Sequence, residues 1–342
     1  MHSHRAVFLA FCILGGMFAL AAPAAGQSVA DFYRGKTIAI VMGTNPGGSY
    51  DLYGRLIGDH LSRYIPGNPS IIMEHMPGAG GVIAGNYIYG TGPQDGTKIL
   101  LSHSIPLAEK LTPTGVRFES AKFQWLGTFD AIAHTMAMWH TTQVNSIEAL
   151  KSKPLVIGSF AKSHLTYQFP ALMKHVLGLN YQLTTGYRSG SDLNLALERG
   201  EVHGWAASWE NLIGTRPQWV AEKKVFLLVS FTLERKKQIP DVPTLLELTP
   251  PDKKDIVEFV TAGTPFGRAM AVGPGVPKDR VDALRKAFDA VMKDPAFLAD
   301  AAKRRLDIDP RPAEYPHALA NKLATASPDL VARVKKAIGQ DD

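Results

Sequence analysis

A short apolar run, a loop rich in small residues and a helix-like segment follow one another in both halves of the 342-residue chain. In the first half, the β-branched run Thr37–Met42 precedes a loop at 43–49, and apolar residues then recur at helical spacing over 50–64. Pro46 and the glycines of the loop break any regular element, and the spacing that follows favours an amphipathic helix. Strands that alternate with helices predict an α/β fold.

The same order returns further along the chain. We expect strands at 71–73, 99–101, 155–157 and 225–231, and helices at 165–177, 192–199 and 279–293. This organisation predicts a doubly wound, parallel sheet flanked by helices in each of two domains, and the chain length suits two domains. The segments 123–139 and 259–272 are the expected crossovers, which places domain 1 at 27–130 with 266–342 and domain 2 at 131–265.

Residues 1–26 have the organisation of a secretory signal peptide. A short basic start ends at Arg5, an uncharged and mostly apolar run covers 6–22, and small residues follow up to Gly26. A single membrane anchor is the alternative, but the run is short against the roughly 20 residues that a spanning helix needs. We expect cleavage near Gly26.

Composition and motifs exclude several classes of protein. The single cysteine, Cys12, rules out a disulfide framework, a CxxC pair or a cysteine zinc site within one chain. HExxH, GxxxxGK[ST] and GxSxG do not occur, so the commonest zincin, P-loop and α/β-hydrolase interpretations have no support. The formal net charge of +6 is too diffuse to predict nucleic-acid binding. We expect Arg235-Lys236-Lys237, the tightest basic run, to be solvated surface.

Four loops share small residues and a place between a strand and a helix: 47–49, 78–81, 159–163 and 189–191. The start of a helix has free N–H groups and a partial positive charge, so it attracts anions. In open α/β sheets such loops gather at the carboxyl ends of the strands, where ligands bind. One loop alone is more often a plain turn, but two such loops in each half predict a cleft for an anion.

Competing interpretations of these residues are weaker. The run at 78–85 is not GxGxxG, which disfavours a dinucleotide site, and we expect no cofactor. Asp51 falls in a first helical turn, four residues before Arg55, so a structural ion pair is expected rather than a catalytic role. His103 and His164 lie on loops and could donate to a carboxylate, although an isolated loop histidine is more often a packing residue. No spacing supports a metal site or a nucleophile with its base.

Five segments carry a resemblance to a known family: Asn45-Pro46-Gly47-Gly48-Ser49-Tyr50-Asp51 with Arg55, Glu74-His75-Met76-Pro77-Gly78-Ala79-Gly80-Gly81, Pro93-Gln94-Asp95-Gly96-Thr97, Pro240-Asp241-Val242-Pro243-Thr244-Leu245-Leu246-Glu247 and Gly273-Pro274-Gly275-Val276-Pro277. In these segments the chain resembles the Bug/TctC family, the periplasmic solute-binding receptors of tripartite tricarboxylate transporters. The resemblance covers most of the mature chain and is strongest over 37–101.

The resemblance implies a two-domain Venus-flytrap receptor in the periplasm that binds a small carboxylate and delivers it to the large and small permease subunits of a membrane transporter. It implies no catalysis, and we expect a monomer. The candidate ligand-binding residues that follow from it are Pro46, Gly47, Gly48, Ser49, Pro77, Gly78, Ala79, Gly80, Ser102, His103, Ser159, Phe160, Ser163, His164, Tyr187, Ser189, Gly190 and Ser208.

Two departures from the family pattern leave the ligand open. Ala161, Ser163, His164 and Tyr167 replace usual residues of the middle loop, and the stretch 202–209 contains tryptophans where an aspartate is usual. These changes suit a larger or aromatic acid as well as a di- or tricarboxylate, whereas buried core tryptophans are the plainer alternative. A secreted enzyme that uses Ser102 or Ser163, or a sensor that signals to a membrane partner, remains an alternative function.

Overall fold

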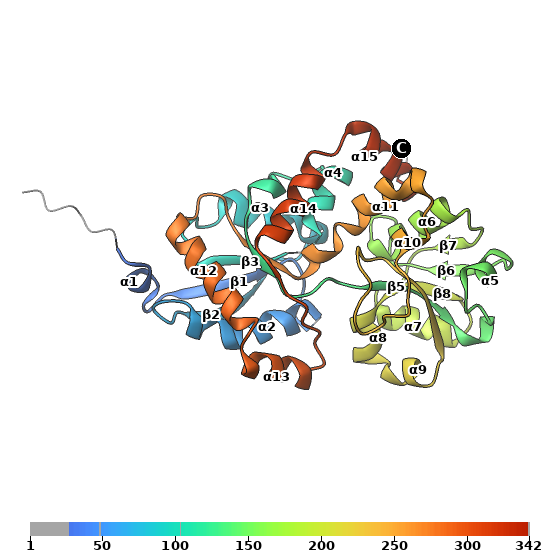
Figure 1. The fold of residues 1–342 in the computed structure, drawn as a ribbon, viewed down its shortest axis with the longest axis horizontal. Helices are drawn as coiled ribbons and strands as arrows, with labels where there is room; N and C mark the ends of the chain where they lie inside the picture. Colours follow the sequence, from blue (N-terminus) through green and yellow to red (C-terminus); the bar gives the residue numbers. More distant parts are fainter. Residues whose placement is uncertain (1–26, 48, 103, 341–342) are drawn as a thin grey trace, which may run out of the picture.

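The chain forms two lobes, each a β-sheet covered by helices (Figure 1). The structure is a computed structural model that describes residues 27–47, 49–102 and 104–340. The expected signal peptide lies outside these ranges, as do Gly48 and His103. Among the helices within them, none has both the length and the apolar character needed to cross a bilayer.

Lobe 1 is built on a sheet with the strand order β11-β4-β10-β3-β1-β2. Its strands are β1 Thr37–Met42, β2 Ser70–His75, β3 Lys98–Leu101, β4 Gln124–Thr128, β10 Ala269–Val272 and β11 Arg311–Pro312. β1 pairs in parallel with β2 and β3, so Met42 lies opposite both His75 and Leu101. The carboxyl ends of these three strands therefore share one edge of the sheet.

Lobe 2 is built on a second sheet with the order β7-β6-β8-β5-β9. Its strands are β5 His134–Trp139, β6 Val156–Gly158, β7 Gln182–Thr184, β8 Gly204–Ser208 and β9 Val225–Ser230. β6 pairs in parallel with β7 and β8, whereas β5 runs antiparallel to β8 and β9. The carboxyl ends of β6, β7, β8 and β9 thus lie at the edge where β5 begins.

Helices cover both sheets and alternate with the strands along the chain. Those of lobe 1 are α1 Val29–Tyr33, α2 Ser49–Leu61, α3 Val82–Asn86, α4 Ile105–Leu111, α12 Lys278–Val291, α13 Pro295–Lys303 and α14 Glu314–Ala324. Those of lobe 2 are α5 Ile147–Lys151, α6 Leu165–Leu177, α7 Gly190–Glu198, α8 Trp209–Thr215, α9 Pro217–Ala221, α10 Leu245–Leu248 and α11 Lys254–Thr261. The last helix of the described chain is α15 Pro328–Ala337.

β1 shows why the sheet needs helices on both faces. Ile38 and Ile40 point to one face and pack in the core that contains residues of α2, α12 and α13. Ala39 and Val41 point to the other face and join a second core that runs on into lobe 2. All four side chains are almost fully buried, which explains the continuous apolar run at this strand.

Two crossovers bring the carboxyl edges of the two sheets to face each other. In lobe 1, Thr128 at the end of β4 pairs with Ala269 at the start of β10. In lobe 2, His134 at the start of β5 pairs with Ser208 at the end of β8. The chain therefore leaves lobe 1 and enters lobe 2 at the strand ends that carry the glycine- and serine-rich loops. Figure 1 shows these segments between the lobes.

The fold class predicted from the sequence is confirmed, with one refinement. The expected strands and helices are present within a few residues of their predicted bounds. The sheets are mixed rather than wholly parallel, because β5 and β10 follow the crossovers and enter their sheets in the opposite direction.

The domain bounds stay a prediction. α15 lies inside 266–342, the second segment predicted for domain 1, yet its Arg333 pairs with Asp255 of α11, inside the range predicted for domain 2.

Candidate functional site

The loop after β1 is held by a small polar network. The Gly47 N–H donates to Asp51 Oδ2 at 3.1 Å, and Arg55 Nε donates to the same oxygen at 3.0 Å. His75, at the end of β2, lies with Nδ1 2.8 Å from the Thr44 carbonyl oxygen and Nε2 3.2 Å from Asp51 Oδ1. The structural role predicted for Asp51 is confirmed. The Gly47 amide, a predicted ligand donor, is bonded to Asp51 in this conformation.

The loop after β2 depends on its glycines. Gly78, Ala79, Gly80 and Gly81 all have positive φ angles, 135°, 46°, 62° and 94°. Residues other than glycine rarely adopt this region, so the backbone accounts for the three glycines, and Ala79 is the exception. Ala79 and Gly80 are exposed. The loop therefore presents backbone at the same edge of the sheet as the loop after β1.

The loop after β6 places an aromatic ring beside a histidine. Phe160 and His164 have ring centroids 4.7 Å apart. His164 Nδ1 accepts from the Thr166 N–H at 3.1 Å, so it caps the start of α6. The ring proton of the neutral side chain then belongs on Nε2, where it can be donated to a ligand. Burial within the loop lowers the pKa of His164, which favours this neutral form.

His164 is solvent-accessible although protein surrounds its ring, as is expected of a residue that lines a cleft.

Two predicted serines cap helices at the neighbouring strand ends. Ser189 Oγ accepts from the Asp192 N–H at the start of α7, and Ser208 Oγ accepts from the Asn211 N–H at the start of α8. Each hydroxyl acts as an acceptor in its cap, so its own proton can be donated elsewhere. A Cβ on Gly190 would lie 2.9 Å from the Asn211 amide nitrogen, so the loops after β7 and β8 meet.

Other predicted site residues contribute to the packing of the lobes. Ser159 is buried and donates to the Thr184 carbonyl oxygen at 2.7 Å, which ties the end of β6 to the end of β7. Ser102 is also buried, and its N–H donates to the Ala269 carbonyl oxygen. Tyr187 is half-buried against the core of lobe 2. Pro46, Ser49, Pro77 and Ser163 are exposed.

The structure thus gathers the candidate residues at two facing edges: Pro46, Gly47, Ser49, Pro77, Gly78, Ala79, Gly80 and Ser102 in lobe 1, and Ser159, Phe160, Ser163, His164, Tyr187, Ser189, Gly190 and Ser208 in lobe 2. Their role in binding stays a prediction. Gly48 and His103 lie outside the described residues.

The stretch 202–209 departs from the family pattern, and both of its tryptophans are buried. Trp205 is 2% exposed and packs in the core of lobe 2, and Trp209 is 8% exposed beside Ala133 and Ile239. The indole N–H groups of both have no hydrogen-bond partner within the described chain. The plainer alternative, that they are core residues, agrees with this burial. Phe160, whose ring lies 6.2 Å from that of Trp205, is the more accessible aromatic group.

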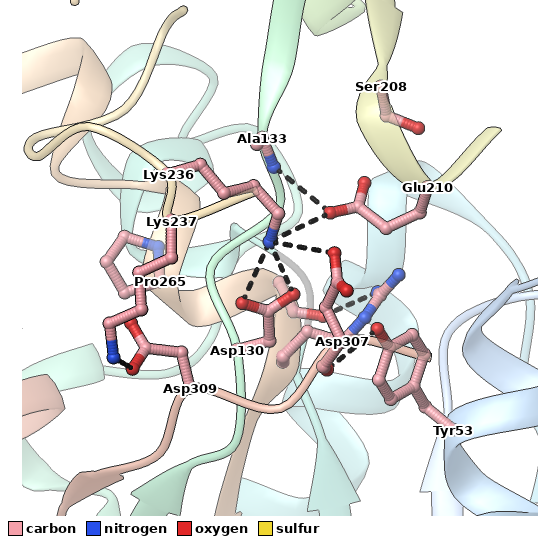
Figure 2. Close-up of polar contacts among 12 residues, drawn as sticks. Tyr53, Asp130, Ala133, Ser208, Glu210, Lys236, Lys237, Pro265, Asp307 and Asp309 are labelled. Atoms are coloured by element: carbon pink, nitrogen blue, oxygen red, sulfur yellow. Dashed lines mark hydrogen bonds and ion pairs between the residues drawn. The ribbon is translucent and has the colours of Figure 1, made fainter. Parts of the chain in front are cut away.

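A buried group of charges joins the lobes at the crossovers. We call Asp130, Glu210, Lys236 and Asp307 the Lys236 cluster (Figure 2). Lys236 Nζ lies 3.0 and 3.1 Å from the two oxygens of Asp130, 3.4 Å from Asp307 and 3.6 Å from Glu210. The three carboxylates lie close enough together to hold a cation, and the ammonium of Lys236 lies among them.

The pKa shifts in this cluster follow from three carboxylates sharing one ammonium. Burial raises the pKa of Asp130 to about 7 against the opposing effect of Lys236. Burial acts to lower the pKa of Lys236, but the carboxylates around it raise that pKa above its usual value. The charged form is therefore favoured at Lys236 and disfavoured at Asp130, which has lost its water and has acidic neighbours.

The expectation of a solvated basic run is wrong for Lys236. Arg235 and Lys237 are exposed and pair with Glu247 and Asp309, but the Lys236 side chain is only 7% exposed. The sequence held no signal for this difference, because the carboxylates that surround Lys236 come from distant segments. Arg268 and His134 were also missed, because their burial depends on segments that are distant in the sequence.

Arg268 and His134 lie at the starts of β10 and β5, where the crossovers enter the two sheets. Arg268 is 1% exposed, and its Nη2 donates to Ser49 Oγ at 3.2 Å. His134 is 9% exposed, and burial lowers its pKa to about 3, so it is neutral at pH 7. Both residues belong to the floor of the region between the facing edges.

Two hollows lie elsewhere between the lobes. A cavity of about 60 Å³ beside the Lys236 cluster is lined by Thr128, Thr264 and Pro265 among others. An open groove of about 590 Å³ lies between α8, α9 and α13, with Ile213, Pro217, Leu298 and Leu306 in its walls. Neither hollow is lined by the predicted loop residues.

Comparison with known proteins gives sequence relatives and structural neighbours of one kind. No family model matches the chain. It is 26% identical over 296 residues to a UPF0065 protein in the gbd 5′ region of Cupriavidus necator, covering 83% of this chain and 82% of that protein. It is 27% identical over 304 residues to protein BugT of Bordetella pertussis, covering 84% and 86%.

Among solved structures, a TctC solute-binding protein from Polaromonas superposes with a TM-score of 0.67 at 16% identity, covering 90% of this chain and all of that one. MatC of Rhodopseudomonas palustris with bound malate gives a TM-score of 0.59 at 19% identity, covering 89% and 99%. A structure of an R. palustris protein with adipate superposes with a TM-score of 0.62 at 17% identity, covering 90% of this chain and 97% of that one.

The fold is therefore that of the two-domain periplasmic binding proteins. Within that class, the resemblance of the chain to the Bug/TctC family is confirmed.

Proposed function

We propose that the protein is a periplasmic solute-binding protein that holds a small carboxylate between its lobes. The observation that carries the proposal is the arrangement of the two sheets, whose carboxyl edges face each other across the crossovers with a set of loops and helix starts on each side. In open α/β sheets ligands bind at this edge. The region between the lobes is thus the site.

The groups at these edges suit an anionic ligand. His164 presents Nε2–H, and Ser189 and Ser208 keep a hydroxyl proton that their caps do not use. Hydrogen bonds to a charged group contribute about 1.5–3 kcal/mol each, and a micromolar Kd needs about 8 kcal/mol. Three to five such bonds with some apolar contact therefore supply enough free energy, after the cost of closing the lobes.

The structural neighbours support the same class of ligand. Malate and adipate are both small dicarboxylates, and each is bound in a protein that shares this fold. Delivery of the ligand to the two permease subunits of a tripartite transporter is the role we propose by resemblance to the Bug/TctC family. Export through the expected signal peptide would place the protein in the periplasm.

A secreted enzyme is the second candidate, but no observation favours it. Of the two serines considered, Ser163 is exposed and its carbonyl accepts from Gln168. The His164 ring nitrogen Nδ1 faces Thr166 rather than a serine. A sensor with the same fold would bind the ligand in the same way. Neighbouring genes for membrane permease subunits would distinguish a transport receptor from such a sensor.

Thermal unfolding with a panel of acids tests the proposal. The panel contains malate, adipate, citrate, nicotinate and benzoate, with the diamides of malic and adipic acid and a neutral sugar as controls. We expect at least one acid to raise Tm in a saturable manner, because a ligand that binds only the folded state stabilises it. A rise with the sugar or the amides and none with any acid would overturn the proposal.

A further inference from the structure

We propose that Arg268 is the specificity-determining cation of the cleft, the group that makes the site prefer a carboxylate over a neutral ligand of the same shape. The inference rests on the proposed function and names a residue that neither the loops nor the resemblance assigns. Its evidence is the position, the burial and the incomplete pairing of one guanidinium.

The position of Arg268 follows from the topology. It is the residue before β10, where the return crossover reaches lobe 1, and its carbonyl accepts from the Phe129 N–H of the outgoing crossover. The side chain reaches α2, where Nη2 donates to Ser49 Oγ at 3.2 Å. Ser49 is the first residue of a helix of 13 residues and belongs to the first predicted binding loop.

Arg268 is buried without a carboxylate at bonding distance. Its side chain is 1% exposed, and no ion pair within 4.0 Å joins it to any acidic residue of the described chain. Nη1 donates to the Gly267 carbonyl oxygen at 3.0 Å, and the rings of Tyr50 and Tyr53 lie 4.6 and 4.3 Å from Cζ. A buried cation is normally paired with an anion, so this arrangement leaves the charge incompletely compensated.

One donor of the guanidinium is unused. Arg268 Nε is buried and has no hydrogen-bond partner in the described chain. The Nε–H and Nη2–H groups lie on one edge of the guanidinium, and Nη2 of this edge contacts Ser49 at the start of α2. Such an edge matches the two oxygens of a carboxylate, and the N–H groups at the start of the helix favour the same charge. A carboxylate at Ser49 would be bonded by both.

The nearest acidic groups suggest a rival role. Asp130 and Glu210 of the Lys236 cluster act on Arg268 electrostatically, beyond bonding distance. If Arg268 served only to balance them, its loss would lower stability and leave ligand preference unchanged. The ligand must also reach a residue that is covered in this conformation, which requires the lobes to separate along the crossovers, as in hinge closure.

The test compares wild-type protein with R268Q, R268K and the control R280Q by isothermal titration. Arg280 offers the matched control, since its Cζ lies 3.5 Å from the Phe32 ring centroid and its Nη1 donates to the Asp95 carbonyl oxygen, away from the facing edges. The probes are malate and adipate, each beside its diamide, and Tm is measured for every variant.

We expect R268Q to weaken binding of the acid by about ten- to a hundred-fold, because glutamine removes the charge and keeps at most one of the two donor groups. The preference of the protein for the acid over the diamide should narrow as well. R268K keeps the charge without the planar fork and should fall between R268Q and wild type, which keeps the test available if R268Q does not fold. R280Q should bind as wild type does.

Three outcomes would overturn the inference: unchanged acid affinity in R268Q, an equal loss for acid and amide, or wild-type affinity in R268K when R268Q does not fold. In each of these the wild type still binds the acid, so the proposed function survives. Failure of the wild type to bind any acid would instead overturn the proposed function, and this inference with it.

Discussion

Lys236 Nζ lies within 3.1 Å of both carboxylate oxygens of Asp130, and both side chains are buried where the chain crosses between the lobes. Asp130 belongs to the outgoing crossover, Lys236 follows β9, and the nearby Asp307 and Glu210 come from lobe 1 and lobe 2 (Figure 2). This one lysine therefore connects four segments at the hinge. Loss of the Lys236 side chain should therefore lower the stability of the whole fold.

The variant K236M is expected to lower the free energy of unfolding by about 3–5 kcal/mol, because it leaves buried carboxylates without their cation. Chemical denaturation measures the change. K237M is the matched control, since Lys237 is exposed and its pair with Asp309 should contribute about 1 kcal/mol or less. Equal stability of K236M and K237M would contradict the role assigned to the Lys236 cluster.

The pH dependence of stability should carry the signature of Asp130. Burial raises its pKa in the folded state to about 7, above the unfolded value of 3.8. Between these values the folded state holds a proton that the unfolded state has lost, so the free energy of unfolding falls as the pH rises, by up to about 1.4 kcal/mol per pH unit. Above pH 7 this contribution is constant.

Buried His134, whose pKa is lowered to about 3, gives the opposite slope below its unfolded value, so the comparison must be made between variants. Relative to D130N, which cannot titrate at this position, the wild type should lose stability from pH 5 to pH 7. Urea unfolding at several pH values measures the difference. A difference that stays constant, or that grows in favour of the wild type, would show that Asp130 does not titrate in this range.

His75 should matter for binding more than for stability. Its two ring nitrogens contact the Thr44 carbonyl oxygen and Asp51, so H75F should loosen the loop after β1. We expect roughly a tenfold loss of acid affinity with about 1–2 kcal/mol lost from the free energy of unfolding, the cost typical of broken side-chain hydrogen bonds.

H60F is the control for this prediction, because His60 contacts Asp300 on the outer side of lobe 1. It should lower stability without changing affinity. If H60F and H75F affected affinity equally, the loop after β1 would have no special part in binding.

Phe160 should distinguish aromatic from aliphatic acids. It is half-buried beside His164, so F160A removes an apolar surface at the edge of lobe 2. If the ligand is aromatic, F160A should weaken its binding by about five- to tenfold, consistent with the loss of one ring contact, and malate binding should change less. F226A, at a half-buried phenylalanine on β9, serves as the control, and calorimetry measures all three proteins.

The sequence placed the strands and helices well because their signals are local. The apolar run of β1 and the helical spacing of α2 follow directly from burial on defined faces, and Gly78 and Gly80 follow from positive φ angles. The two carboxyl edges face each other because of the way the crossovers join the lobes. This arrangement could be anticipated from the sequence, because strands in both halves end in similar loops.

The charges at the hinge could not be predicted in this way. Lys236 has exposed lysine and arginine neighbours in the sequence, and Arg268 stands alone in an apolar stretch, so their burial depends on segments far away in the chain. The internal hydrogen bonds of Ser159 and Gly47 also depend on tertiary contacts. Sequence patterns thus predicted the loops at the two facing edges, whereas the structure added the buried charges between them.

A crystal structure of the complex with the acid that gives the largest rise in Tm tests the central claim most directly. We predict that the carboxylate lies between the lobes, in contact with the loops after β1 and β6 and with Arg268. Electron density for the acid in the groove between α8, α9 and α13, or on the outer face of one lobe, would contradict the account.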